Sequence, residues 1–143
     1  MATTWNDLVS YVRVRYEVFR QTDRTLLFDL PTADGRTQRV AVHHIGESEK
    51  DTEDGGSGSE PGRDEWIQIE SPIARADAVD LGKLLELAGR SVVGGVAVTD
   101  GIVMFRHATA LHELTLTGFD RPFQLVTSRA DELEHELTGT DHF

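Results

Sequence analysis

The feature that most constrains this chain is an acidic run at residues 47–65, which contains no apolar side chain. Such a run cannot bury enough surface to offset the entropy lost when it is ordered. Its eight acids against Lys50 and Arg63 give it more than half of the chain's net charge of -11. We therefore expect a flexible acidic insertion at about 46–63, with a core built from the apolar blocks on either side of it.

The remaining composition fits one domain over residues 1–143. Hydrophobic residues make up 38% of the chain, and a compact chain of this size buries roughly 70% of its unfolded surface. Cysteine is absent, which excludes disulfides, thiolate metal sites and a cysteine nucleophile. No stretch approaches the roughly 18 apolar residues of a membrane span. Because the negative charge also repels phosphate backbones and anionic membranes, we expect a cytoplasmic protein that binds neither nucleic acid nor membranes.

The first half of the chain reads as a helix followed by three strands. Residues 3–20 place apolar or aromatic side chains along one face of a helix, at Trp5, Leu8, Val9, Val12, Tyr16 and Phe19. Alternation of apolar and polar residues predicts strands at 26–30 and 36–43, joined by a turn at Ala33-Asp34-Gly35. A third strand is predicted from Trp66 to Glu70, ending at Ser71-Pro72.

The second half predicts a helix, two strands and a long final helix. A helix at 80–88 follows the N-cap candidates Asp77 and Asp80, and strands around 92–98 and at 102–106 are joined by Asp100-Gly101. Residues 107–117 fit neither period. The final helix is predicted to start at the N-cap Asp120 and to stop at Gly139, with an apolar stripe at Phe123, Val126, Ala130, Leu133 and Leu137. The order is α-β-β-β-α-β-β-α, which is an α+β fold.

The polar residues do not predict a catalytic, metal or cofactor site. His43 and His44 are adjacent on a strand, so they point to opposite faces and cannot bind one ion together. His107 and His112 lie five residues apart, which matches no recognised ligand spacing. The Gly94-Gly95 pair lacks the lysine of a phosphate-binding loop. One alternative stays open: a small-ligand or enzymatic pocket that uses Arg106, His107 or His112.

Two strands carry apolar side chains that call for a partner. Ile67 and Ile69 alternate toward one face, which leaves Trp66 and Gln68 on the other. A tryptophan on the second face of a sheet indicates that both faces are covered or that one is a partner surface. The strand around 92–98 also needs cover, so we take Trp66, Gln68, Val96 and Val98 as candidate partner-binding residues.

The chain resembles the type III secretion chaperone-like family, in particular its YbjN-type branch, whose fold is that of the Tir chaperones. The resemblance covers nearly the whole chain except residues 46–63. It depends mainly on the order of elements and on a few degenerate motifs: Trp5 with Leu8 and Tyr16, Arg36-x-Gln38-x-Val40-x-Val42, Trp66 leading to Ser71-Pro72, Asp100-Gly101, and Ala130-Asp131-Glu132-Leu133-Glu134 followed by Gly139 and Asp141.

The resemblance implies a twisted antiparallel five-stranded sheet with packed helices. It also implies a non-enzymatic homodimer that holds an extended segment of another protein against apolar surface. We therefore predict a chaperone-like or adaptor module that binds a protein client, without a cofactor.

Overall fold

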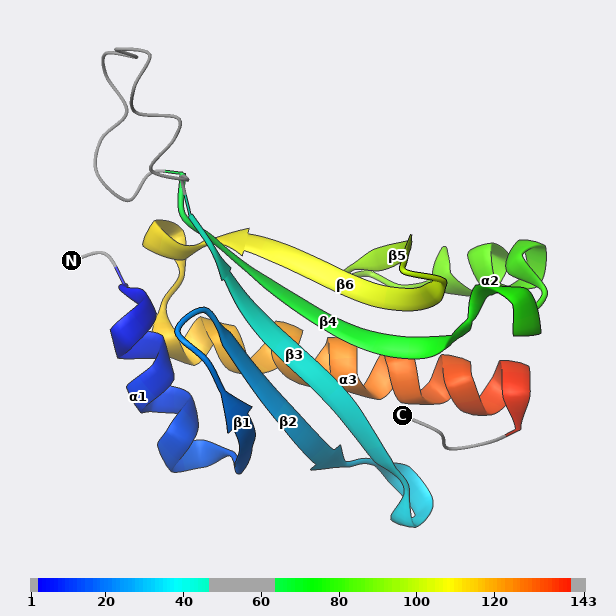
Figure 1. The fold of residues 1–143 in the computed structure, drawn as a ribbon, viewed down its shortest axis with the longest axis horizontal. Helices are drawn as coiled ribbons and strands as arrows, with labels where there is room; N and C mark the ends of the chain where they lie inside the picture. Colours follow the sequence, from blue (N-terminus) through cyan, green and yellow to red (C-terminus); the bar gives the residue numbers. More distant parts are fainter. Residues whose placement is uncertain (1–2, 47–63, 140–143) are drawn as a thin grey trace.

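The computed structural model describes residues 3–46 and 64–139, which form an open six-stranded antiparallel sheet with three helices (Figure 1). The helices are α1 (Trp5–Arg15), α2 (Leu81–Ala88) and α3 (Leu116–Thr138). The strands are β1 (Val18–Gln21), β2 (Thr25–Pro31), β3 (Thr37–Ile45), β4 (Trp66–Arg75), β5 (Gly95–Thr99) and β6 (Ile102–Ala110). They lie in the order β1-β2-β3-β4-β6-β5, so β1 and β5 are the two edges. The α+β class is confirmed, whereas the predicted acidic insertion lies outside the described residues, apart from Gly46.

The predicted five-stranded sheet is wrong by one strand, because the first helix is shorter than its apolar stripe. It ends at Arg15, where Tyr16 turns to an extended conformation (φ -133°, ψ 150°), and residues 18–21 form β1 instead. Val18 and Phe19 suit a strand, and pairing with β2 gives their backbone hydrogen-bond partners that helix continuation would also have supplied. Phe19, predicted on the buried stripe, is 59% exposed.

The third predicted strand is longer than its sequence indicated. β4 continues through Ser71-Pro72 to Arg75, with a register shift between Pro72 and Ala74 that accommodates the proline. Buried Gln38 supports this irregular stretch, since its Nε2 donates to Ser71 Oγ at 2.8 Å and to the Pro72 carbonyl at 2.7 Å.

The ambiguous stretch at 107–117 divides between a strand and a helix. β6 runs on to Ala110, a 3-10 turn follows at Leu111–Glu113, and α3 begins at Leu116. The N-cap of α3 is Thr115, whose hydroxyl accepts from the Gly118 N–H, so the predicted cap Asp120 is wrong. The Asp120 carboxylate instead accepts from the Tyr11 hydroxyl at 2.5 Å and the Tyr16 hydroxyl at 2.8 Å, which ties α1 to α3.

Other local predictions are confirmed. Both Asp-Gly pairs form tight turns with positive φ at the two residues, 57° and 75° at Asp34-Gly35, and 52° and 78° at Asp100-Gly101. Asp80 caps α2 by accepting from the Lys83 N–H. Gly139 ends α3 in the left-handed conformation with φ 69°. The strand expected around 92–98, however, begins only at Gly95.

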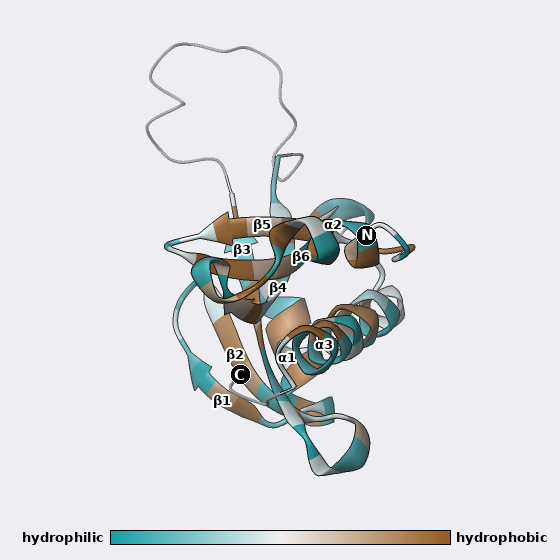
Figure 2. Cartoon of the chain, turned by 90° about the vertical axis from the view of Figure 1, so that its right-hand side faces the viewer, coloured by the Kyte–Doolittle hydropathy of each residue, from teal (hydrophilic) through white to brown (hydrophobic). Residues whose placement is uncertain are grey.

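The core lies between the three helices and one face of the sheet, which curves around α3 (Figure 2). Its centre is aromatic: Phe123 of α3 packs 5.1 Å from Phe28 of β2 and 5.0 Å from Phe119, between ring centroids. Leu8 and Val12 of α1 and Leu84 of α2 join the same buried cluster. The other face of the sheet is not covered by any helix of the described residues, and none of those helices is long and apolar enough to cross a membrane.

Candidate functional site

The four predicted partner-binding residues lie on opposite faces of the sheet. Val96 pairs with Phe105, which is fully buried on the helix-covered face, and Val98 shares that face because side chains alternate along a strand. Trp66 and Gln68 alternate with the buried Ile67 and Ile69, so they lie on the open face. The structure therefore brings Val96 and Val98 together and separates them from the other two.

Val96 and Val98 line an apolar groove between β5 and α2, which we call the α2–β5 surface. The groove has a volume of about 260 Å³ and is lined by Leu81, Leu84, Leu85, Val96, Ala97, Val98 and Val103. Three of these side chains are unusually open for their size, with Leu81 42%, Leu85 61% and Val98 55% exposed. Exposed apolar side chains that gather at one place, rather than standing singly, mark interaction sites.

The strand beside this groove has a free edge. β5 pairs with β6 alone, and the two-residue turn at Asp100-Gly101 makes Thr99 and Ile102 the closing hydrogen-bonded pair of the hairpin. Hydrogen-bonding residues alternate along an antiparallel strand. The N–H and C=O groups of Val96 and Val98 therefore point away from β6, toward the free edge.

Gly94 holds the start of β5 in place. Its φ is +84°, and an added Cβ would lie 2.7 Å from Phe105 Cε1 and 2.9 Å from the Arg106 carbonyl oxygen. Only glycine combines this conformation with so close an approach to β6. The loop before β5 is thus pressed against the sheet, and the edge is a fixed part of the fold.

A line of side-chain hydrogen bonds crosses the open face over five strands. Thr25 Oγ1 lies 3.0 Å from His43 Nδ1, and His43 Nε2 lies 2.8 Å from Glu70 Oε1. Arg106 Nη2 donates to Glu70 Oε2 at 3.0 Å and to Thr99 Oγ1 at 3.0 Å. The hydrogen bond from His43, helped by the positive charge of Arg106, holds the pKa of Glu70 below its ordinary value despite burial.

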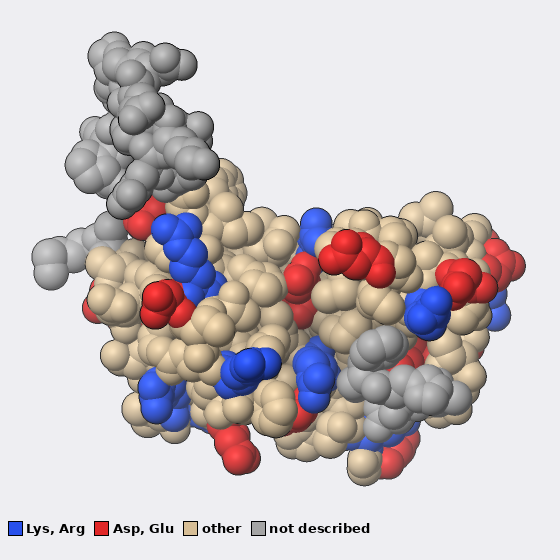
Figure 3. Space-filling view, viewed as in Figure 1, with Lys and Arg blue, Asp and Glu red and all other residues tan. Residues whose placement is uncertain are grey.

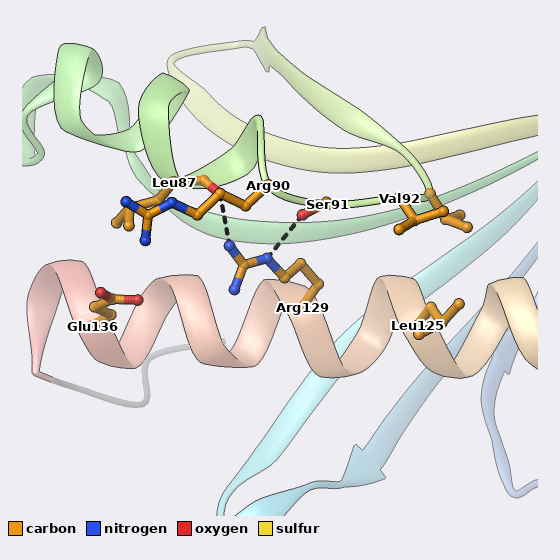
Figure 4. A pocket seen from close by; sticks show the side chains of 8 residues that line it. Leu87, Arg90, Ser91, Val92, Leu125, Arg129 and Glu136 are labelled. Carbon is orange, nitrogen blue, oxygen red and sulfur yellow. Dashed lines mark hydrogen bonds between the residues drawn. The ribbon is translucent and has the colours of Figure 1, made fainter.

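A second hollow of about 360 Å³ lies between the loop after α2 and the middle of α3 (Figure 4). Arg129 points across it, and its guanidinium donates to the Leu87 carbonyl at 2.7 Å, to Ser91 Oγ at 2.8 Å and to Glu132 at 3.1 Å. These donors hold the carboxyl end of α2 on α3. We therefore assign Arg129 a structural role.

The residues of the predicted ligand pocket do not converge. Arg106 and His107 are neighbours on β6 and point to opposite faces, and His112 lies in the 3-10 turn beyond the end of that strand. Burial lowers the pKa of His107. Among residues 3–46 and 64–139, no three His, Asp or Glu side chains are grouped so that they could hold a metal ion.

Sequence reasoning missed the two exposed leucines of α2 and the polar line across the open face. Leu81 and Leu85 were assigned to the buried stripe of the helix, although five apolar residues in α2 are more than one buried face needs. That excess was the available signal for the leucines. The polar line joins side chains from five strands, so no spacing in the sequence indicates it.

No protein-family model matches the chain, and its sequence matches none of the curated proteins.

Proposed function

We propose that this chain is a cytoplasmic, non-enzymatic protein-binding module, chaperone-like or adaptor in role, that holds an extended segment of a partner protein. The resemblance to type III secretion chaperones, which implies this mode of binding, supports the proposal from the sequence. The α+β architecture is compatible with it, although the sheet has a sixth strand.

The observation that carries the proposal is the α2–β5 surface, where a free strand edge lies beside an apolar groove. An extended segment added to β5 gains main-chain hydrogen bonds along the edge and buries alternate side chains in the groove. Either feature alone is common, since every open sheet has edges and many surfaces carry single apolar residues. Their coincidence at Val96 and Val98 favours recognition of a polypeptide over recognition of a small molecule.

The test is capture of partners from the native cell with the wild-type chain and with Leu85→Glu. Leu85 is 61% exposed, so the substitution costs little folding energy but places a charge in the groove. The matched control is Val14→Glu, because Val14 is 90% exposed on α1 and does not line the groove. Partners that bind wild type and V14E but not L85E support the proposal, and a partner set that survives L85E contradicts it.

A homodimer is the second part of the proposal, with the open face around Trp66 as its contact. Trp66 and its cross-strand neighbour Ile45 are 44% and 43% exposed, and a specific contact needs roughly 800 Å² per partner. Sedimentation at micromolar concentration should give twice the mass of 15.9 kDa for wild type, and Trp66→Glu should shift it toward one protomer. A wild-type species at the protomer mass contradicts the dimer.

A further inference from the structure

We infer, resting on the proposed function, that the α2–β5 surface selects a partner segment that is basic and carries apolar side chains at alternate positions. The inference combines three properties of the surface: the spacing of its free backbone groups, the face on which its groove lies, and the charges around it.

The free backbone groups fix which residues of the partner form hydrogen bonds. Val96 and Val98 present their N–H and C=O groups to the edge, whereas Gly95, Ala97 and Thr99 bond to β6. A partner strand therefore exchanges hydrogen bonds with β5 through every second residue only. The residues between them do not need a free N–H on this side.

The groove determines the side chains of those same partner residues. Residues directly opposite one another in neighbouring strands have their side chains on the same face. The partner residues opposite Val96 and Val98 thus point toward α2, where Leu81 and Leu85 are exposed. Apolar side chains at these two alternating positions fill the groove, and the intervening positions face solvent on the open side.

The charges around the surface favour a basic partner. Asp80, Glu86 and Asp100 are exposed beside it, against Lys83. The nearby Arg75 is bound to Asp77 at 3.2 Å and adds no free positive charge. Figure 3 shows acidic side chains at the right-hand end of the molecule, which is where α2 lies in Figure 1. β5 itself has no charged residue that would repel a cation.

The charge preference is tested with two capped peptides, one alternating valine and lysine and the other alternating valine and glutamate, each long enough to span β5. In 0.15 M salt we expect the lysine peptide to bind the full chain about fivefold more tightly or better, because several weak surface ion pairs add. The difference should shrink in 1 M salt, where screening acts over about 3 Å. Shifts of the Val96 and Val98 amide NMR signals report the site. Equal or tighter binding of the glutamate peptide overturns the inference.

The backbone pattern is tested by methylating peptide nitrogens of the lysine peptide. Methylation at alternating valines, which pair with β5, should weaken binding about tenfold, since each N–H removed leaves a carbonyl unpaired. Methylation at the intervening lysines should change binding by less than about threefold. Equal effects at both sets of positions overturn the inference, and so does a second copy of the chain that occupies the edge and excludes the peptide. The capture experiment with L85E is independent of these peptides, so failure here leaves the proposed function to be judged separately.

Discussion

The two edges of the sheet are built differently. β1 is four residues long, has a register irregularity between Val18 and Arg20, and exposes charged and polar side chains. β5 pairs with β6 in unbroken register over five residues and has no charged side chain. Irregularity and charge are ways in which proteins prevent an edge from pairing with other chains. β1 is therefore protected against pairing and β5 is left able to pair.

The elements behind the two edges are also attached differently. On the β1 side, the β2–β3 hairpin is tied to α3 by a buried ion pair in which Arg36 Nη2 lies 2.9 Å from Asp131 Oδ2. On the β5 side, Arg129 ties α2 to α3 through neutral oxygens of Leu87 and Ser91. The protected edge thus rests on a charged anchor inside the core, while the edge that can pair lies beside exposed leucines.

The largest effect is expected from removing the anchor on the β1 side. Asp131→Ala leaves the Arg36 guanidinium without its buried partner and should lower the free energy of unfolding by about 3–5 kcal/mol. The control is Asp29→Ala, because the Asp29–Arg39 pair on the same hairpin is 40% and 49% exposed and should cost less than about 1 kcal/mol. Urea unfolding measures both, and equal losses would contradict this assignment of the anchor.

A somewhat smaller effect is expected where β5 begins. Gly94→Ala forces a side chain into a positive-φ position and against Phe105, which should cost about 3 kcal/mol. Gly95→Ala is the neighbouring control, since an added Cβ there meets nothing within 4 Å. It should change stability by less than about 1 kcal/mol. If thermal or urea unfolding gave similar values for the two variants, the loop would not be pressed against β6.

Two proline substitutions test which side of β5 is free. Ala97→Pro removes an N–H that bonds to β6 and should cost about 2 kcal/mol, whereas Val98→Pro removes an N–H at the free edge and should cost about 1 kcal/mol or less. Val98→Pro should nevertheless abolish partner capture. Partner binding that survives in V98P, at wild-type stability, would show that the edge is not used.

The smallest effect is expected from the polar line that links strands near both edges. The depressed pKa of Glu70 means that its contribution to stability is fully present above its unfolded value of about 4.5 and is lost as pH falls through the folded value. Glu70→Gln should therefore be about 1 kcal/mol less stable than wild type near pH 7, with the gap closing below pH 4.5. Urea unfolding across this range measures it. A gap that stays constant with pH would exclude ionised Glu70 as its source.

The local sequence determined most of the elements, because their signals are short in range. The two Asp-Gly turns, the cap at Asp80 and the stop at Gly139 each depend on the conformational preferences of one or two residues. The alternation around Ile67 and Ile69 correctly predicted a buried and an open face for β4. The same alternation predicted that Trp66 is exposed.

Elements that depend on pairing with distant residues were predicted less well. Residues 18–21 extended a helical stripe in sequence but pair with β2 in the structure, and Ser71-Pro72 read as a strand end although β6 continues the pairing. Asp120 read as a helix cap, yet two tyrosines of α1 engage its carboxylate. In each case a long-range contact supplied more hydrogen bonds or burial than the local preference.

The sequence by itself determined an acidic α+β chain with apolar residues beyond what one core face requires, and it indicated Val96 and Val98 as residues that need cover. Only the tertiary structure decided where those residues lie. The strand order makes β5 an edge, and the placement of α2 puts Leu81 and Leu85 beside it. Whether a strand is central or at an edge is a property of pairing between segments far apart in the chain, so its own residues do not carry that information.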